Sequence, residues 1–140
     1  MGVVDGVTRA RDESATEAFG AALWKTLRAP ICVLLSAPLG TGKTALVRGM
    51  LRAAGHDGDV PSPTFAIVQS YETLPPLYHL DLYRLNSASE LAELGIEDML
   101  TEGIVVAEWP ENGDGWPDDA VRVIGRIEED GMRVWEVARR

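Results

Sequence analysis

The chain has 140 residues and a formal net charge of −9, with 46% hydrophobic and 25% charged residues. This length and composition predict one globular domain with a real core, and no apolar run reaches the roughly 20 residues that a transmembrane helix needs. The negative charge argues against autonomous binding of nucleic acid, because such binding depends on Lys and Arg side chains that neutralise phosphates. If an RNA is involved, a partner must hold it.

The N-terminus and the single cysteine narrow the class of protein further. Residues 1–6 lack the apolar segment of a secretory signal peptide, so we expect a cytoplasmic protein, with residues 1–12 as a flexible N-terminal extension. Cys32 is the only cysteine, which excludes a disulfide framework and a zinc cluster. Because Cys32 lies within an apolar run, we expect it to be a small buried hydrophobic residue.

The first predicted elements are a helix and a buried strand. Ser14 to Glu17 has the form of a capping box, and apolar side chains at helical spacing follow it until Pro30 ends the helix. The apolar run Ile31 to Leu35 then predicts a strand. A helix-like segment, Ala45 to Ala54, follows after a connection that contains two glycines. The order of helix, strand, loop and helix is typical of an α/β domain.

The loop between that strand and the second helix is the most informative segment of the chain. Its sequence, Ala37-Pro-Leu-Gly-Thr-Gly-Lys-Thr44, follows the phosphate-binding pattern G-x-x-x-x-G-K-[ST], except that Ala stands at the first position. The glycines allow backbone N–H groups to converge on a phosphate, the lysine can reach the β- and γ-phosphates, and the final threonine can ligate Mg²⁺. We therefore expect ATP or GTP to bind here, contacted by Leu39, Gly40, Thr41, Gly42, Lys43, Thr44 and Ala45.

The middle of the chain predicts two strands and one further helix. Phe65 to Tyr71 and Leu77 to Leu82 flank a proline turn, and we expect them to pair as antiparallel neighbours. Ser87 to Glu90 is another capping box, which opens a helix that runs through Met99.

The last third of the chain predicts strands only. Ile104 to Ala107 is a short apolar strand, and Val121 to Ile127 with Met132 to Val137 are expected to form a terminal hairpin. The predicted fold is a single α/β domain of the P-loop NTPase type. We expect its sheet to be mixed and mostly parallel, with an antiparallel hairpin, and to carry helices on both faces.

Hydrolysis or phosphoryl transfer also needs a carboxylate at the end of a neighbouring strand to hold Mg²⁺. Glu108 closes the apolar strand that ends at Ala107, where an unpaired acid would be costly. Asp81 shares a strand face with His79, and its alternative role is that of a polar residue on the solvated face of the strand. We expect both carboxylates near the ligand-binding edge of the sheet, and which of them ligates Mg²⁺ directly stays open.

Three further residues are weaker candidates. Thr64 lies in a segment with two prolines, and its hydroxyl could sense a γ-phosphate as switch loops do. His79 has no second histidine or cysteine beside it, so we expect a hydrogen-bonded structural histidine rather than a metal ligand. Trp109 is followed by Pro110 and Gly113, which favours an exposed loop position over core packing.

Taken in order, these motifs resemble one family, the TsaE (formerly YjeE) ATPases that serve bacterial threonylcarbamoyladenosine modification of tRNA. The resemblance runs from about Ser14 to Trp135, nearly the whole chain. Its most specific blocks are Leu39 to Thr44, Val60 to Phe65, Tyr78 to Leu85, Glu93 to Glu97 and Glu108 to Glu111. The family usually has Gly-Asp where this chain has Ala37 and Pro38.

The resemblance implies a Mg²⁺-dependent ATPase that is slow alone and depends on partners. Lys43 would bind phosphate, Thr44 and Glu108 would hold Mg²⁺, and Asp81 would assist the metal or the water. Thr64 and Trp109 would belong to mobile elements beside the nucleotide, with Trp109 among the residues that contact it. The catalytic group implied in this way is Lys43, Thr64, Asp81 and Glu108.

The resemblance also implies partners. The protein would act on a complex of TsaB and TsaD and promote its turnover, so that adenosine 37 is modified in tRNAs that read ANN codons. The tRNA would be contacted only indirectly, through that complex, and neither a membrane nor DNA is an expected partner.

Two other functions stay open at this point. A small nucleotide or nucleoside kinase could use Asp81 and Arg84 to bind an acceptor, although 140 residues leave little for an acceptor pocket and a lid. A non-hydrolysing binding module would switch by nucleotide occupancy alone, and Glu108→Ala would then leave partner function intact while ATP still binds. A GTPase is disfavoured because no Asn-Lys-x-Asp segment occurs.

Overall fold

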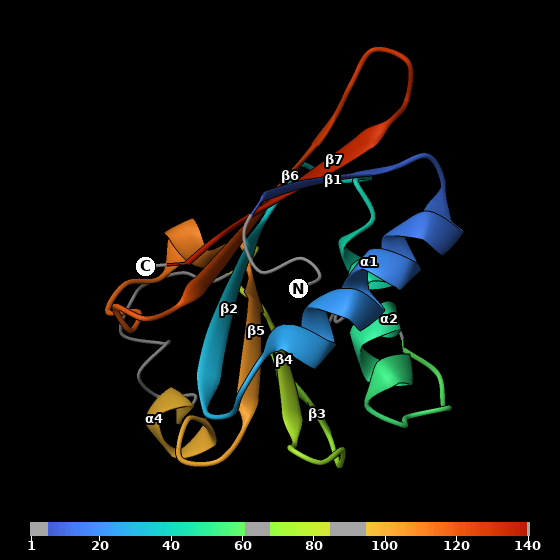
Figure 1. Cartoon of the computed structure of the whole chain (residues 1–140). Coiled ribbons are helices and arrows are strands. Elements are labelled where there is room, and N and C mark those ends of the chain that lie inside the picture. Colours follow the sequence, from blue (N-terminus) through green and yellow to red (C-terminus); the bar gives the residue numbers. More distant parts are fainter. Residues whose placement is uncertain (1–5, 61–67, 85–94, 140) are drawn as a thin grey trace.

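The computed structural model of the chain describes residues 6–60, 68–84 and 95–139, and its centre is a seven-stranded sheet (Figure 1). The helices are α1 (Glu13–Thr26), α2 (Lys43–Ala53) and the short α4 (Ile96–Met99), with a 3₁₀ turn η1 (Pro110–Asn112). The strands are β1 (Gly6–Ala10), β2 (Ile31–Ser36), β3 (Val68–Tyr71), β4 (Leu77–Asp81), β5 (Ile104–Glu108), β6 (Val121–Ile127) and β7 (Arg133–Ala138).

The sheet is parallel in the middle and antiparallel at both sides. Its strand order is β1-β7-β6-β2-β5-β4-β3, in which β6, β2, β5 and β4 are parallel neighbours. The pairs β1–β7, β6–β7 and β3–β4 are antiparallel. The strand β2 lies between parallel neighbours and is covered on both faces, which explains its uninterrupted apolar sequence. Because β2, β4 and β5 run in the same direction, their carboxyl ends meet at one edge of the sheet.

The helices α1 and α2 cover one face of the sheet, and two glycines let their backbones touch (Figure 1). A Cβ atom on Gly20 would lie 2.0 Å from the carbonyl oxygen of Leu46, and one on Gly49 would lie 1.9 Å from that of Glu17. No side chain fits at such distances, so this crossing requires glycine although glycine inside a helix costs roughly 0.5–1 kcal/mol. The close contact fixes where the N-terminus of α2 lies relative to the sheet.

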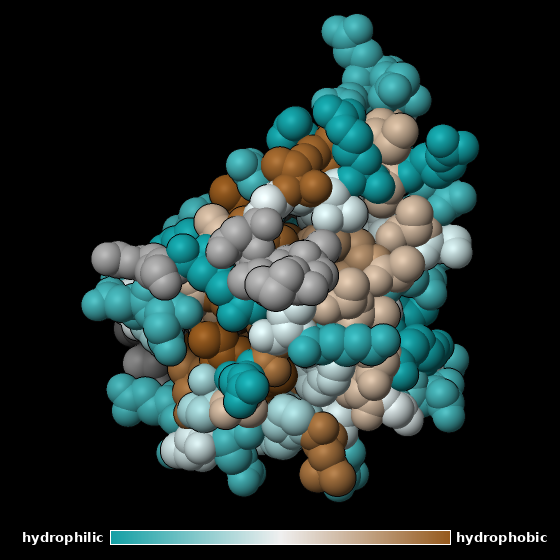
Figure 2. Space-filling view, viewed as in Figure 1, coloured by the Kyte–Doolittle hydropathy of each residue, from teal (hydrophilic) through white to brown (hydrophobic). Residues whose placement is uncertain are grey.

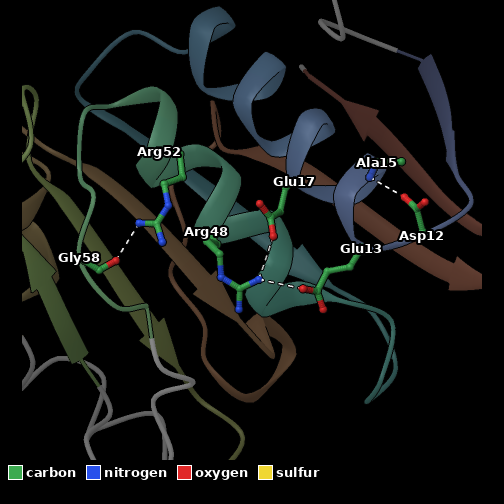
Figure 3. Close-up of polar contacts among 7 residues, drawn as sticks. All are labelled: Asp12, Glu13, Ala15, Glu17, Arg48, Arg52 and Gly58. Atoms are coloured by element: carbon green, nitrogen blue, oxygen red, sulfur yellow. Dashed lines mark hydrogen bonds and ion pairs between the residues drawn. The ribbon is translucent and has the colours of Figure 1, made fainter.

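Polar contacts hold the same helix pair on its outer side (Figure 3). The N–H of Ala15 donates to the Asp12 carboxylate at 2.8 Å, which caps α1. Arg48 of α2 donates to Glu13 at 3.2 Å and to Glu17 at 3.0 Å (Figure 3). Partly exposed ion pairs of this kind contribute roughly 0–1 kcal/mol each, so they orient the helices more than they stabilise them.

Two expectations for the N-terminal part are wrong. The flexible extension expected at residues 1–12 does not hold for Gly6–Ala10, which forms β1 and pairs antiparallel with β7. Pairing with the edge of β7 gives the backbone of this segment its hydrogen bonds, a long-range effect that composition does not reveal. The helix α1 begins at Glu13 after an Asp12 cap, and not at the predicted capping box, because Asp caps a helix as well as Ser does.

The predicted strand pairs are confirmed where the structure describes them. The strands β3 and β4 pair antiparallel, and so do β6 and β7. Residues 65–67 of the predicted strand and residues 87–94 of the predicted helix lie outside the described residues. The short helix α4 covers the last residues of that predicted helix.

The second face of the sheet is covered by α4, η1 and loops in the part of the chain that the structure describes. Its core contains Cys32, Leu34 and Val105, against which Trp109 and Trp116 pack. Cys32 is fully buried, as expected, and burial raises the pKa of its thiol to about 12. Helices therefore lie on both faces, as predicted, although the second face carries a short one.

Apolar side chains on the surface are scattered among polar ones. Figure 2 shows hydrophilic residues over much of this view, with an apolar projection at the bottom, where the β3–β4 turn lies in Figure 1. In that turn, Leu74 is 91% exposed. Across residues 6–60, 68–84 and 95–139, no helix is long and apolar enough to cross a membrane.

Candidate functional site

The connection from β2 to α2 is a tight turn that depends on two glycines. Gly40 has a φ of +84° and Gly42 a φ of +110°, a region that residues with a Cβ rarely adopt. Thr41 is fully buried and closes the turn, because its N–H and its hydroxyl both donate to the carbonyl of Pro38, at 3.3 and 2.7 Å. The helix α2 then begins at Lys43, and its N-cap residue Gly42 has no side chain. The first N–H groups of α2 therefore face the loop, where an anion can bind them.

Lys43 is buried at this end of α2, with 7% of its surface exposed. Its Nζ donates to the carbonyl oxygen of Ala37 at 2.7 Å and lies 4.1 Å from the centroid of the Trp109 ring. A carbonyl dipole and an aromatic face both stabilise a cation. Lys43 is thus a buried ammonium group held beside the loop by contacts that a phosphate could replace.

Asp81 and Glu108 lie side by side at the carboxyl ends of β4 and β5, as their sequence positions predicted. They are register partners in the parallel pair, and Leu35 of β2 is the partner of Glu108 on its other side. Leu35 belongs to the core beneath α1 and α2, so the two carboxylates emerge on the face that carries α2. The strands therefore bring both acids to the edge at which α2 begins.

Glu108 is 5% exposed and is paired with a histidine. Its Oε2 lies 2.5 Å from Nε2 of His79, which is fully buried. The Nδ1 of His79 has no hydrogen-bond partner among the described residues, so the contact of Nε2 with Glu108 is what orients the ring. The expectation of a hydrogen-bonded histidine is confirmed, and its partner is the predicted Mg²⁺ ligand.

Burial shifts the pKa of two groups in this cluster in ways that disfavour charge. Burial lowers the pKa of Lys43, and the negative charges of Glu108, Asp81 and Glu111 act in the opposite direction. Burial also raises the pKa of Asp81. The hydrogen bond from the backbone N–H of Tyr83 lowers this pKa, Glu108 raises it, and His79 and Lys43 lower it. Perturbed groups gathered at one edge of a sheet are typical of functional sites.

Trp109 follows Glu108 directly and has a left-handed backbone, with φ 57° and ψ 49°. For a residue with a Cβ this conformation costs roughly 1–2 kcal/mol. Its ring is half-buried, packs against the second core and lies 5.0 Å from the ring of Tyr83. The expected exposed loop position is therefore wrong, because the aromatic ring gains contacts with Lys43 and Tyr83. Strain at a residue that touches Lys43 favours a functional role.

The oxygen ligands around Lys43 fit a magnesium ion that is shared with phosphates. The described residues hold no group of three or more His, Cys, Asp or Glu that could bind a metal by themselves. Mg²⁺ is usually held by one or two carboxylates, a hydroxyl and substrate phosphates, and the pair of Asp81 and Glu108 with Thr44 at the start of α2 has that composition. The negative charge of Glu108 raises the pKa of Asp81, and a cation bound beside them would act against this effect.

The remaining predicted residues are placed less directly. Leu39 is 67% exposed at the tip of the loop, whereas Ala45 is buried in the core, so its contact with a nucleotide would be through its backbone. Thr64 lies outside the described residues.

One residue beside the loop was missed by the sequence analysis. Arg133, at the start of β7, donates to the carbonyl oxygens of Gly40 and Thr41, at 3.2 and 3.3 Å. The two segments are separated by 92 residues for the Thr41 contact, and the strand carries no motif. The role of Arg133 becomes visible only when the structure places the start of β7 beside the loop.

Comparisons with known proteins identify the family to which the sequence is similar. Residues 10–134 match the family described as "Threonylcarbamoyl adenosine biosynthesis protein TsaE". The chain is 47% identical over 87 residues to a protein from Haemophilus influenzae named tRNA threonylcarbamoyladenosine biosynthesis protein TsaE, which covers 61% of this chain and 55% of that protein. A protein of the same name from Nostoc is 36% identical over 132 residues, which covers 90% of this chain and 81% of that protein. The chain thus spans about half of the Haemophilus protein and most of the Nostoc one.

A solved structure shares the fold. The crystal structure of YdiB from Bacillus subtilis superimposes with a TM-score of 0.78, over 96% of this chain and 85% of that chain. The sequences are 23% identical, so this likeness bears on the fold alone.

Proposed function

The chain belongs to the TsaE family, and from that premise we propose that it is the ATP-binding and ATP-hydrolysing subunit required for threonylcarbamoyladenosine biosynthesis in tRNA. The observation that carries the proposal is a cluster at the start of α2, in which Lys43, Glu108 and His79 are buried and Asp81 is half-buried. Buried charges destabilise a fold unless they are paired, so their concentration at one edge needs a functional reason.

In the proposed nucleotide complex, the backbone of residues 40–44 binds the phosphates. Lys43 exchanges its contact with the carbonyl of Ala37 for the β- and γ-phosphates, and each charge-assisted hydrogen bond contributes roughly 1.5–3 kcal/mol. The start of α2 adds the positive end of the helix dipole. The triphosphate is therefore held by backbone N–H groups and an ammonium group, and the helix dipole adds a field that favours negative charge.

Thr44, Glu108 and Asp81 supply the oxygen ligands for Mg²⁺. When bound, the ion neutralises the charge that develops on the phosphate oxygens during transfer. The hydrogen bond from His79 holds Glu108 in one orientation, with Oε2 occupied by the imidazole. Asp81, whose pKa burial raises, is the better placed of the two acids to orient the attacking water and accept its proton.

Nucleotide binding would also change the surface next to the site. Trp109 contacts the Lys43 ammonium, so movement of Lys43 toward phosphate removes one of the contacts that hold the strained Trp109 backbone. We propose that a complex of TsaB and TsaD recognises this ATP-dependent surface in the cytoplasm, that Thr64 contributes to it, and that hydrolysis releases the complex. The tRNA is then held by that complex, in keeping with the net charge of −9.

The test measures ATP hydrolysis with and without TsaB and TsaD, together with threonylcarbamoyladenosine formation on tRNA. We expect the partners to stimulate hydrolysis, and Glu108→Gln to abolish both hydrolysis and modification while the variant still folds. Glu136→Gln, an exposed acid on β7, is the matched control and should behave as wild type.

Two results would contradict the proposal. If Glu108→Gln binds ATP and still supports modification, the protein is a nucleotide-dependent binding module that does not need hydrolysis. If ATP is consumed only when a small phosphoryl acceptor is supplied, the protein is a kinase.

A further inference from the structure

The guanidinium group of Arg133 joins the loop after β2 to the turn between β6 and β7. Its Nε donates to the carbonyl of Thr41 at 3.3 Å and its Nη2 to the carbonyl of Gly40 at 3.2 Å. Its Nη1 donates to the carbonyl of Gly131, in the β6–β7 turn, at 3.1 Å. One side chain therefore holds two successive carbonyl groups of the loop and one of the hairpin.

These bonds determine which way the amide groups of the loop point. In a trans peptide the carbonyl and the following N–H point in opposite directions. Because Arg133 holds the Gly40 carbonyl, the N–H of Thr41 is turned away from β7, and it is found donating to Pro38. By the same geometry, holding the Thr41 carbonyl turns the N–H of Gly42 away from β7 and to the opposite side of the loop.

We propose that Arg133 is a positioning residue that presets the phosphate loop for the nucleotide, an inference that rests on the ATP-binding function proposed above. Gly40 and Gly42 make the loop conformation possible, but glycine loses more conformational entropy on ordering than any other residue. Because Arg133 orders the loop when the protein folds, the Gly42 amide is already oriented before the phosphate binds.

The inference requires arginine and not merely a positive charge. The planar fork of the guanidinium reaches two neighbouring carbonyl groups at once, whereas a lysine ammonium is a single flexible point charge. Arg133→Lys retains the charge near the phosphates and loses the fork. It therefore separates positioning of the loop from simple electrostatic attraction.

The experiment compares wild type, Arg133→Lys and Arg133→Gln. Affinities for Mg²⁺–ATP and for inorganic tripolyphosphate are measured by calorimetry, and partner-stimulated hydrolysis gives KM and kcat. We expect both variants to bind both ligands about tenfold more weakly, with KM raised and kcat nearly unchanged, because the loop must be ordered on binding. Without ligand, exchange of the Thr41 amide hydrogen, which is buried and bonded to the carbonyl of Pro38, should become faster in both variants, while exchange at the core residue Val33 stays the same.

Arg126→Gln is the matched control, since Arg126 lies on β6 of the same hairpin and is exposed to solvent. It should bind both ligands as wild type does. Wild-type affinity in Arg133→Lys with a loss only in Arg133→Gln would overturn the positioning role in favour of charge. Unchanged affinity in both would overturn it altogether, and a wild-type protein that binds neither ligand would overturn the ATP-binding function as well.

Discussion

The middle of α2 and its N-terminal end bury opposite kinds of group. In the middle, Gly49 touches the backbone of α1 and apolar side chains fill the space beneath, so that volume decides what is tolerated. At the N-terminal end, Lys43 lies within a cluster that includes Asp81 and Glu108, and burial disfavours charge on two of these groups. The first region stabilises the fold, whereas burial of charged groups in the second costs stability. The close backbone contact at the glycines thus holds the charged end of α2 against the strand ends.

The largest expected effect is the loss of nucleotide binding on changing Lys43 to Met. Two charge-assisted hydrogen bonds of roughly 1.5–3 kcal/mol each are removed, so ATP should bind about 10² to 10⁴ times more weakly. The methionine keeps the apolar stem in place and removes a buried charge, so thermal unfolding should change little. Calorimetry measures the affinity for ATP, and a melting curve measures thermal stability. Full ATPase activity in this variant would overturn the site assignment.

For Gly49→Ala we expect a loss of stability and not a direct loss of nucleotide contacts. Its Cβ would lie 1.9 Å from the carbonyl oxygen of Glu17, so the helices must separate, at a cost of about 3 kcal/mol in the free energy of unfolding. Urea denaturation measures this loss, and Lys25→Ala, at an exposed position in the last turn of α1, serves as the control. If Gly49→Ala has the same urea midpoint as wild type, the close helix contact does not contribute the expected stability.

Cys32→Ser should also act on stability and not on chemistry. The thiol is fully buried on the second face, and a hydroxyl there without a partner costs about 1–3 kcal/mol. Hydrolysis per folded molecule should match wild type. Because burial raises the pKa of Cys32 to about 12, the native protein should also resist alkylation at pH 8 and react only when unfolded. Rapid alkylation of the folded protein would contradict the burial on which this prediction depends.

The smallest expected effect on stability is that of Asp81→Asn, which changes a group of the charged cluster. The folded-state pKa of Asp81 is raised, so the native state binds its proton more tightly than the unfolded state does. The stability that this carboxyl contributes is present below its unfolded pKa and is lost as the pH rises through the folded pKa. Asp81→Asn should therefore be slightly more stable than wild type at pH 7, and this advantage should vanish in acid.

The same variant should hydrolyse ATP more slowly, because the amide cannot accept a proton. Its Oδ1 can still accept the hydrogen bond that the N–H of Tyr83 donates at 3.0 Å, so the local structure is kept. Melting curves between pH 3 and pH 8 measure the stability difference. A variant that is less stable than wild type across this range would show that Asp81 stabilises the fold.

The order of elements along most of the chain could be predicted from local sequence patterns, and so could several residues of the candidate site. The loop Ala37–Thr44 and the acids Asp81 and Glu108 were found because their signals are local: glycine and lysine at fixed spacing, and an acid that ends an apolar strand. Parallel strands bring such ends to one edge, so the grouping of these residues could also be predicted, and the structure places them together. Their roles with ATP and Mg²⁺ stay predictions.

The contacts between distant segments could not be predicted from local sequence patterns. The pairing of Gly6–Ala10 with β7, the backbone contact at Gly20 and Gly49, and the bonds from Arg133 to the loop each join segments far apart in the chain. Trp109 was placed wrongly because its left-handed backbone, which local propensity disfavours, is held by the ring contacts with Lys43 and Tyr83. Local spacing determines which elements form, whereas these contacts depend on how the sheet arranges its strands and on which side chains then meet.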